Sequence, residues 1–228
     1  MARSLAGSFT GKTRGGVAVL GLGRFGRSLA LELMRERTEV LGVDQNPKAV
    51  QSLAGRLTHA VEADTTNEEA LRQLSIHELD RAVVGIGSHL EASILTASIL
   101  VNFGIPHIWA KAISNSHARI LTQLGVHHVV RPEHDMGRRT AHLVRGRLLD
   151  YIEFDDGYAI VKTVPPRWIV GLSLEESRVR SRFGVTVVGV KQAGQDFTHA
   201  TADTVVRDGD LIIVSGPEHS VERFAEEA

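Results

Sequence analysis

Residues Val17 to Gly26 read Val-Ala-Val-Leu-Gly-Leu-Gly-Arg-Phe-Gly, and an acid, Asp44, ends the next apolar run. An apolar run followed by G-x-G-x-x-G predicts a strand, a tight turn and a helix. Gly21 permits the turn, Gly23 lets the backbone approach a phosphate, and Gly26 lets the helix pack closely on the sheet. Because the helix N-terminus then faces an anion, the stretch predicts a nucleotide-binding βαβ unit.

Arg24 and Phe25 lie inside this glycine motif, where the phosphates of a bound nucleotide are expected. Arg24 adds a fork of charged donors that a hydride-transfer site does not require. A positive side chain at a helix start opposes the helix dipole, so it brings no local benefit unless an anion lies nearby. We therefore expect a site that senses phosphate charge.

Charged side chains follow other predicted strands at the same edge of the sheet. Asp44 is placed to accept hydrogen bonds from ribose hydroxyls, and its carboxylate would repel a 2′-phosphate, which disfavours NADP. Its alternative role is to cap a helix, which Asn46 could do instead. Lys111 is a candidate phosphate contact, or else a solvated lysine at a strand end. The glycines also fit a tight turn in a domain that binds no ligand.

The composition is that of an ordinary soluble protein. Of 228 residues, 43% are hydrophobic and 23% are charged, and the net charge of −1 favours neither disorder nor general nucleic-acid binding. The start of the chain lacks the apolar centre of a secretory signal, and no run reaches the roughly 18 apolar residues of a membrane span. The absence of cysteine excludes disulfides and thiol chemistry. We expect a cytoplasmic protein that reaches a membrane only through a partner.

Apolar runs alternate with helical patterns from Val17 to Arg131, which predicts six strands separated by helices. This alternation is typical of an α/β fold with a Rossmann-like, doubly wound parallel sheet. The capping-box patterns Thr65-x-x-Glu68 and Ser88-x-x-Glu91 predict the starts of two of the helices.

The pattern changes after the sixth predicted strand. Two β-rich runs flank Asp155-Asp156-Gly157 and predict a hairpin, and a helix is expected over Ser173–Arg182, within a small α+β domain. We therefore predict four parts: a flexible tail (1–14), a nucleotide-binding domain (15–134), a connector helix (135–150) and a C-terminal domain (151–228).

Six pieces of sequence, taken in order, resemble the regulators of potassium conductance, the RCK family. They are Gly21-Leu-Gly-Arg-Phe-Gly26, Val43-Asp44, Ala63-Asp-Thr-Thr66, Trp109-Ala-Lys-Ala112, Pro132-Glu-His-Asp-Met-Gly137 and Asp208-Gly-Asp-Leu-Ile-Ile-Val-Ser-Gly216. The resemblance is to the gating subunits of KtrA and TrkA type and covers nearly the whole chain after the tail. A glycine motif alone is weak evidence, but the ordered set is specific.

The resemblance implies an RCK N-terminal domain that binds a nucleotide and an RCK C-terminal domain. It implies ATP and ADP as ligands, with NAD(H) as a further candidate, and no catalytic residues. It also implies that dimers, which exchange the connector helix, assemble into an octameric ring. The ring would gate a membrane potassium-translocating subunit of KtrB or TrkH type from the inner face of the membrane.

Individual residues match the family's nucleotide site. Arg24, contributed partly by the neighbouring subunit, would contact the γ-phosphate of ATP. Asp64 matches a position that reads the adenine, although it could equally cap a helix. Glu133 matches a glutamate that helps to hold a divalent cation, Mg²⁺ or Ca²⁺, against the phosphates. Its alternative role is that of an acid in the first turn of a helix.

The C-terminal domain of some relatives binds cyclic di-AMP at a dimer interface. Arg180 and the strand expected over Val185–Val190 match that region. The chain departs from the pattern at Ala200 and Ala202, where relatives often carry proline. Cyclic di-AMP is therefore a weaker ligand prediction than ATP and ADP.

Two other functions remain as alternatives. Tyr158-x-x-x-Lys162 matches the tyrosine–lysine pair of short-chain dehydrogenases, but it lies in a β-rich run, where four residues span about 13 Å instead of one helical turn. An NAD-dependent oxidoreductase is therefore the less favoured alternative. An RCK-type sensor that regulates a different channel or an exchanger stays open.

The eleven histidines form no recognised metal motif. His117, His134 and His142 lie on or near predicted helices without the H-E-x-x-H spacing, so we expect them at the surface. The arginines of the connector helix could imitate a nucleic-acid-binding stripe. Because aromatic residues are not interleaved with them, a solvated or intersubunit face is favoured, and no nucleic-acid partner is expected.

Overall fold

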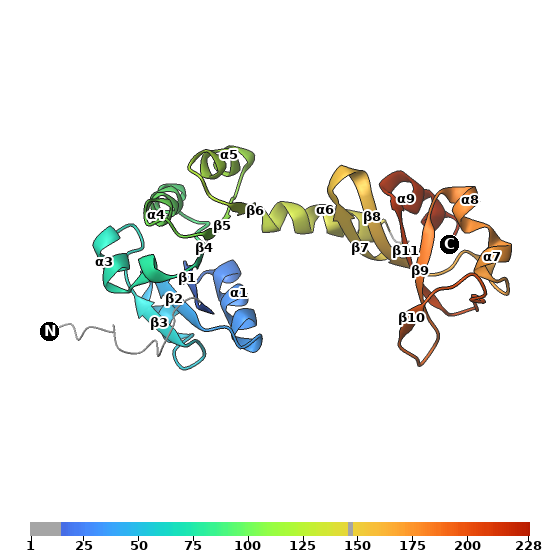
Figure 1. The fold of residues 1–228 in the computed structure, drawn as a ribbon, viewed down its shortest axis with the longest axis horizontal. Helices are drawn as coiled ribbons and strands as arrows, with labels where there is room; N and C mark the ends of the chain where they lie inside the picture. The colour runs from blue at the N-terminus through green and yellow to red at the C-terminus, as the bar shows by residue number, and fades with distance from the viewer. Residues whose placement is uncertain (1–14, 146–147) are drawn as a thin grey trace. The chain divides into compact units, whose positions relative to one another are not determined.

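The computed structural model describes residues 15–145 and 148–228, which form two units that divide between Glu133 and His134 (Figure 1). The tail predicted for residues 1–14 lies outside the described residues. Among the described residues, no helix is long and apolar enough to cross a bilayer.

The first unit is a six-stranded parallel sheet in the order β3-β2-β1-β4-β5-β6, which confirms the predicted fold class. Its strands are β1 (Val17–Leu20), β2 (Val40–Asp44), β3 (His59–Glu62), β4 (Arg81–Val84), β5 (His107–Lys111) and β6 (His128–Val130). Between them lie α1 (Arg24–Arg35), α2 (Pro47–Gln51), α3 (Glu68–Gln73), the 3-10 helix η2 (Ile76–Glu78), α4 (Leu90–Asn102) and α5 (Asn115–Gln123).

Strand β1 lies at the centre of this sheet and is buried along its whole length. Its side chains alternate between two apolar cores. Ala18 and Leu20 join a core that includes Leu100 of α4, whereas Val17 and Val19 join a core that includes Ala30 of α1. Helices therefore cover both faces, and this explains why β1 is a continuous apolar run.

The strand order reverses at β1, which pairs with β2 on one side and with β4 on the other. The chain therefore leaves the centre of the sheet in one direction, returns, and continues in the other. In open parallel sheets, ligands bind outside the carboxyl ends of the strands at such a switch point.

The second unit carries a five-stranded antiparallel sheet in the order β10-β9-β11-β8-β7, and confirms the predicted α+β domain. Its strands are β7 (Leu148–Phe154), β8 (Tyr158–Thr163), β9 (Thr186–Lys191), β10 (Phe197–His199) and β11 (Leu211–Pro217). Its helices are α7 (Leu174–Ser177), α8 (Val179–Phe183) and α9 (Glu218–Glu226), with 3-10 helices η3 (Asp155–Gly157) and η4 (Arg167–Ile169), and α6 (Pro132–Val144) leads into it.

Each unit contains one of the two tryptophans of the chain. Trp109 of β5 stacks on His128, with ring centroids 4.7 Å apart. Trp168 of η4 stacks on Phe183 at 5.6 Å and lies edge-on to the fully buried Phe224. The two aromatic clusters thus belong to separate cores.

Two predicted helices differ from the observed ones. The connector helix expected over 135–150 is instead α6, which begins at Pro132, because proline suits a first helical turn, where its missing N–H is not needed. The residues from Leu148 onward belong to β7. The helix expected over Ser173–Arg182 is split into α7 and α8, because Arg178 has φ +49°, a left-handed conformation that an α-helix cannot continue through.

The two predicted capping boxes are also wrong. The hydroxyl of Thr65 lies 2.9 Å from that of Thr96 in the interior, so it does not cap α3. Asn67 does so, because its Oδ1 accepts a hydrogen bond from the N–H of Ala70 at 3.1 Å. Helix α4 begins after His89, which gives no side-chain cap.

Candidate functional site

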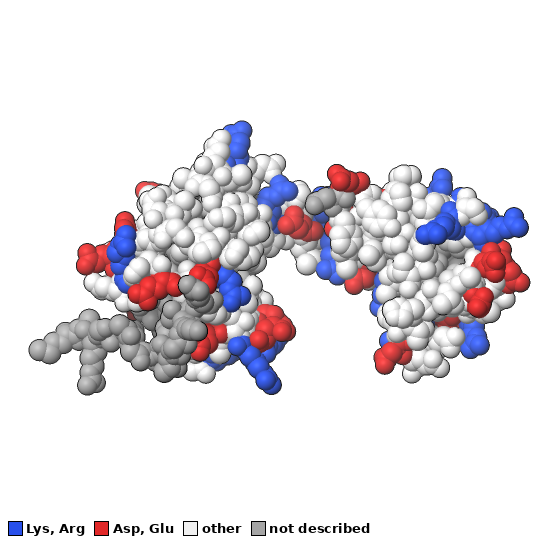
Figure 2. Space-filling model, viewed as in Figure 1, with Lys and Arg blue, Asp and Glu red and all other residues white. Residues whose placement is uncertain are grey.

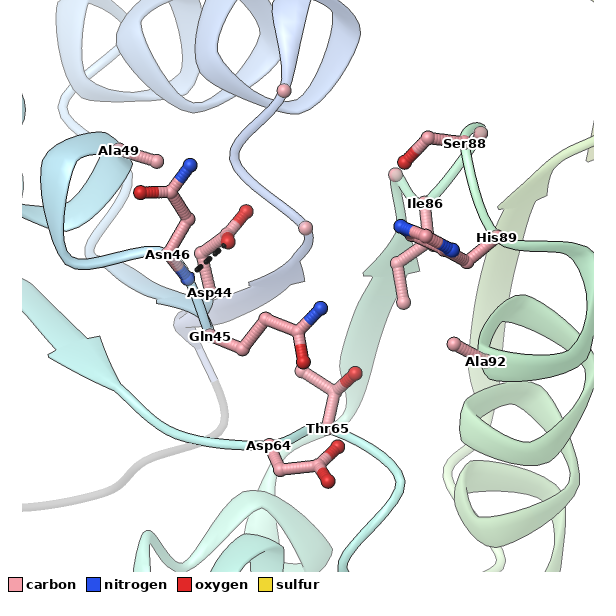
Figure 3. A pocket seen from close by; sticks show the side chains of 14 residues that line it. Asp44, Gln45, Asn46, Ala49, Asp64, Thr65, Ile86, Ser88, His89 and Ala92 are labelled. Carbon is pink, nitrogen blue, oxygen red and sulfur yellow. Dashed lines mark hydrogen bonds between the residues drawn. The ribbon is translucent and has the colours of Figure 1, made fainter.

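A pocket of about 280 Å³ lies at the switch point, at the carboxyl ends of β1 to β4. Figure 3 shows the segment from Asp44 to Ala49 on one side, the segment from Ile86 to Ala92 on the other, and Thr65 and Asp64 between them. The lining residues are Gly21, Gly23, Asp44, Gln45, Asn46, Ala49, Asp64, Thr65, Gly85, Ile86, Gly87, Ser88, His89 and Ala92. Four of the predicted site residues therefore share one pocket.

The three glycines of the motif meet three different requirements. Gly21 has φ +95°, and a Cβ on it would lie 2.8 Å from the Ile86 side chain. A Cβ on Gly26 would lie 1.9 Å from the carbonyl oxygen of Gly21. A Cβ on Gly23 would meet no atom within 4 Å. The turn thus needs glycine at its two ends, and Gly23 leaves space beside the N-terminus of α1 that fits a phosphate.

Asp44 ties the glycine loop to the end of β2. Its Oδ2 accepts a hydrogen bond from the N–H of Leu22 at 2.6 Å. Its Oδ1 accepts one from the N–H of Asn46 at 2.8 Å, which Figure 3 marks with a dashed line. Asn46 caps α2, because its side chain accepts from the N–H of Lys48 at 3.0 Å. Asp44 is therefore not the helix cap, and its carboxylate keeps further lone pairs for donors in the pocket.

Asp64 shapes the loop that follows β3. Its Oδ1 accepts hydrogen bonds from the N–H of Thr66 at 2.9 Å and from the Thr66 hydroxyl at 2.7 Å. These hydrogen bonds hold the pKa of Asp64 below its ordinary value. Because Asn67 caps α3, Asp64 turns the loop at the pocket wall without serving as a helix cap.

A second cluster of predicted residues lies next to the pocket. The largely buried Lys111 donates a hydrogen bond to Glu133 Oε1 at 2.5 Å, and its Nζ lies 5.9 Å from the centre of the Phe25 ring. This hydrogen bond is the main cause that lowers the pKa of Glu133, and the charge of Arg24 adds to it. A Cβ on Gly87, which lines the pocket, would lie 3.3 Å from Lys111 Nζ. The cluster is therefore continuous with the pocket wall.

Arg24 is the first residue of α1 and is exposed. It forms no hydrogen bond or ion pair with residues 15–145 or 148–228. The N-cap residue Gly23 supplies no side-chain cap, and the first turn of α1 contains no acid. The free N–H groups, the helix dipole and the Arg24 charge therefore all favour an anion at this point.

The loop between β4 and α4 forms one wall of the pocket, and its residues are not among the predicted site residues. Gly85 packs against the glycine motif, since a Cβ on it would lie 2.8 Å from the carbonyl oxygen of Gly21. Ser88 and His89 follow in the same wall. The available signal was the pair of glycines around Ile86 directly after an apolar strand.

Two of the three histidines expected at the surface are elsewhere. His117 is only 1% exposed, its Nδ1 accepts from the N–H of Ile113, and burial lowers its pKa. His142 is half-buried and contacts Glu222. His134 is exposed, as expected. The contact of His142 with Glu222 joins positions 80 residues apart, which the local sequence pattern does not indicate.

The remaining predicted residues lie in the second unit. Tyr158 and Lys162 both belong to β8, which confirms that this pair does not have the helical spacing of a short-chain dehydrogenase. Arg180 is exposed, and its Nε donates to the hydroxyl of Thr186 at 3.2 Å. Figure 2 shows basic side chains around α8 and acidic ones around α7. Cyclic di-AMP binding at Arg180 stays a prediction.

Comparison with known proteins identifies the family to which this chain belongs. Residues 17–132 match the TrkA-N domain, and residues 158–228 match the TrkA-C domain. The chain belongs to the RCK family. This RCK protein is 36% identical to Ktr system potassium uptake protein A of Bacillus subtilis over 211 residues, which are 92% of this chain and 95% of the relative. It is 35% identical to Ktr system potassium uptake protein C of the same organism over 208 residues, 91% and 94% of the two chains.

The fold is also found in solved structures. The GsuK channel bound to NAD superposes with a TM-score of 0.67 at 18% identity, over 94% of this chain and 40% of the GsuK chain. The resemblance that the sequence suggested is therefore confirmed for the family and the fold.

Proposed function

We propose that this RCK protein is a regulatory subunit that binds ATP or ADP and thereby gates a membrane potassium-translocating subunit of KtrB type. The observation that carries the proposal is the exposed Arg24, without a hydrogen-bond or ion-pair partner among the described residues, at the uncapped N-terminus of α1 beside the open Gly23 loop. The Ktr relatives are potassium uptake proteins by name, and the GsuK channel of the same fold binds NAD.

In this proposal, different pocket residues bind the phosphates, the ribose and the adenine of the nucleotide. The N–H groups at the start of α1 and the Gly23 backbone bind the phosphates, and Arg24 contacts the terminal one. Asp44 accepts hydrogen bonds from the ribose hydroxyls through its remaining lone pairs. Asp64 lies at the adenine end of the pocket.

Glu133 and Lys111 complete the phosphate end. Lys111 Nζ contacts a phosphate. Glu133 helps to hold Mg²⁺ or Ca²⁺, which the terminal phosphate also coordinates. Glu133 Oε1 is already held by Lys111 at 2.5 Å. A cation therefore either shares the carboxylate with Lys111 or displaces it, which couples the cation to the lysine next to the pocket.

Gating requires that the ligands distinguish two shapes of the assembly. A ligand shifts such an equilibrium only by its differential affinity for the two states. ATP has one more phosphate for Arg24 than ADP has, and coupling of about 1 to 3 kcal/mol per site is typical. In an octameric ring of dimers, eight such contributions would bias an attached transporter at the inner face of the membrane without any bond being broken.

The binding half of the proposal is tested by calorimetric titration with ATP, ADP and NADH in magnesium buffer. Arg24→Ala should weaken ATP binding about 10- to 100-fold, the range for a hydrogen bond to a charged group. Arg27→Ala removes the same side chain from an exposed position of the same helix and should change little. Unchanged discrimination between ATP and ADP in Arg24→Ala would refute the mechanism, and a preference for NADH would favour the oxidoreductase alternative.

The gating half is tested by potassium flux. Vesicles that contain a KtrB-type subunit should conduct differently with ATP and with ADP when the wild-type protein is added. Arg24→Ala should reduce this difference, whereas Arg27→Ala should keep it. Equal flux with both nucleotides would contradict gating while leaving nucleotide binding intact.

A further inference from the structure

Three side chains that the proposed function does not use meet between α6 and α9 in the second unit. They are His142 of α6 and Glu218 and Glu222 of α9. His142 Nδ1 lies 2.9 Å from Glu222 Oε1, and His142 Nε2 lies 3.7 Å from Glu218 Oε1. One ligand atom from each residue lies within 4.8 Å of the other two. A nitrogen and two carboxylate oxygens thus converge from two helices.

The charges of this cluster need a positive group among them. Glu218 and Glu222 are four residues apart on one helix face, where like charges repel. A neutral imidazole has one donor and one acceptor, and a carboxylate only accepts. Because both ring nitrogens of His142 face a carboxylate, a neutral ring can satisfy only one of them. Arg145 supplies one positive charge beside Glu222, and a second proton on the imidazole or a metal ion would supply another between the two carboxylates.

Tyr151 orients His142 and Glu218, two of the three side chains, as the outer-shell contacts of a metal site do. The Tyr151 ring stacks on the His142 ring, with centroids 4.0 Å apart and an 11° angle between the planes. The Tyr151 hydroxyl donates a hydrogen bond to Glu218 Oε1 at 3.2 Å. Such second contacts fix the ligands of known metal sites.

The cluster also has room for solvent on a bound ion. His142 and Glu222 line a cavity of about 90 Å³, together with Arg145, Leu148, Ala225 and Glu226. The side chains of His142, Glu218 and Glu222 are 16%, 35% and 29% exposed, so they are sheltered and still accessible. This leaves both an entry path and space for a water ligand.

We propose that His142, Glu218 and Glu222 bind a divalent transition-metal ion, with zinc as the best match, and that the ion fastens α6 to α9. One imidazole nitrogen, two carboxylate oxygens and a water make a four-coordinate zinc site. Zinc bonds of 2.0–2.1 Å in a tetrahedron put the ligand atoms about 3.3 Å apart. One ligand atom from each of the three residues lies within 4.8 Å of the other two, so the side chains reach this value by small rotations toward the ion. A nitrogen ligand favours zinc over Mg²⁺ or Ca²⁺.

Arg145 provides a competing charge, and this makes the proposal testable. Its Nη1 lies 3.3 Å from Glu222 Oε1, the oxygen that also contacts His142. An arginine in this position weakens the attraction of the site for a cation. Arg145→Gln should therefore bind the metal several-fold more tightly, a gain that partial unfolding cannot imitate.

The experiment is a calorimetric titration of the full-length, chelator-treated protein with Zn²⁺ in the absence of nucleotide. We expect one tight Zn²⁺ per chain and a Tm that rises with Zn²⁺. His142→Asn and Glu222→Gln should each weaken binding by at least about tenfold, since even outer-shell changes do so. His134→Asn is the matched control, because His134 lies on the same helix, is exposed, and has one neighbouring carboxylate at 3.2 Å.

The outcomes separate this site from the nucleotide site. Glu133→Gln should leave Zn²⁺ binding unchanged, and His142→Asn should leave ATP binding unchanged. A wild-type protein that binds no Zn²⁺, or a His142→Asn variant that binds it as wild type does, overturns the proposal. Equal affinities in Arg145→Gln and wild type would also overturn it, because Zn²⁺ would then bind away from the Glu222 carboxylate that Arg145 contacts.

Discussion

The replacement Gly26→Ala tests the packing of α1 on the sheet. A Cβ on Gly26 would lie 1.9 Å from the carbonyl oxygen of Gly21, whereas real Cβ atoms do not come closer than 3.0 Å, so α1 must retreat by about 1.1 Å. The loop cannot yield easily, because the N–H of Gly21 donates to the carbonyl oxygen of Val43 at 2.8 Å. Overpacking of this kind costs about 3 kcal/mol at the upper end of its range. Alanine regains about 1 kcal/mol through helix propensity.

The net loss of about 2 kcal/mol should lower the Tm of the first unit by about 8 °C in scanning calorimetry. Gly23→Ala is the matched control, because its Cβ meets no atom within 4 Å and its φ of −65° suits alanine. Because Gly23 is an N-cap residue, Gly23→Ala should cost less than about 1 kcal/mol of stability. It should still weaken ATP binding, because the added methyl group would obstruct the phosphates. Equal Tm values for the two variants would refute this account of the turn.

Three other changes test the remaining structure. Phe224→Ala empties the core of the second unit and should cost about 3–5 kcal/mol in denaturant unfolding, with ATP affinity unchanged. Asn67→Ala removes the cap on the Ala70 N–H and should cost about 1 kcal/mol; no loss would show that α3 is capped otherwise. Because Lys111 lowers the pKa of Glu133, the stability from this pair is present above the ordinary value of 4.5 and is lost as the pH falls through the lowered pKa. In Lys111→Met, the Glu133 titration followed by NMR should move up towards 4.5, and an unmoved midpoint would contradict the contact.

The sequence predicted the sheet and the glycine turn because both depend on neighbouring residues. The turn from β1 into α1 is complete within ten residues, and glycine is required by the positive φ of Gly21 and by the close approach of Gly26 to the Gly21 carbonyl oxygen. The alternation of apolar runs with helical patterns was likewise sufficient to predict a parallel, doubly wound sheet, although not the order of its strands.

Helix starts were predicted less well, because their side chains have competing partners. Thr65 fits a capping box by sequence, yet its hydroxyl is used by Thr96, 31 residues away. Asp64 accepts a hydrogen bond from the N–H of Thr66, and Asn67 caps α3 through the N–H of Ala70. No local pattern encodes that competition.

The candidate site was predicted as separate residues rather than as an arrangement. Lys111 and Glu133 were each singled out, but their hydrogen bond joins positions 22 residues apart. The cluster around His142 links α6 to α9 across 80 residues, and a spacing rule for one helix could not find it. These contacts depend on how the helices and strands pack together, which cannot be predicted from local sequence patterns.

The placement of the two tryptophans gives each unit its own intrinsic fluorophore. Trp109 rests on an imidazole in the first core, whereas Trp168 lies under the guanidinium of Arg182 at 4.0 Å in the second. Replacing either indole with phenylalanine leaves emission from the other core alone. Unfolding of the nucleotide unit and of the C-terminal unit can therefore be recorded separately, within the intact chain and without an attached dye.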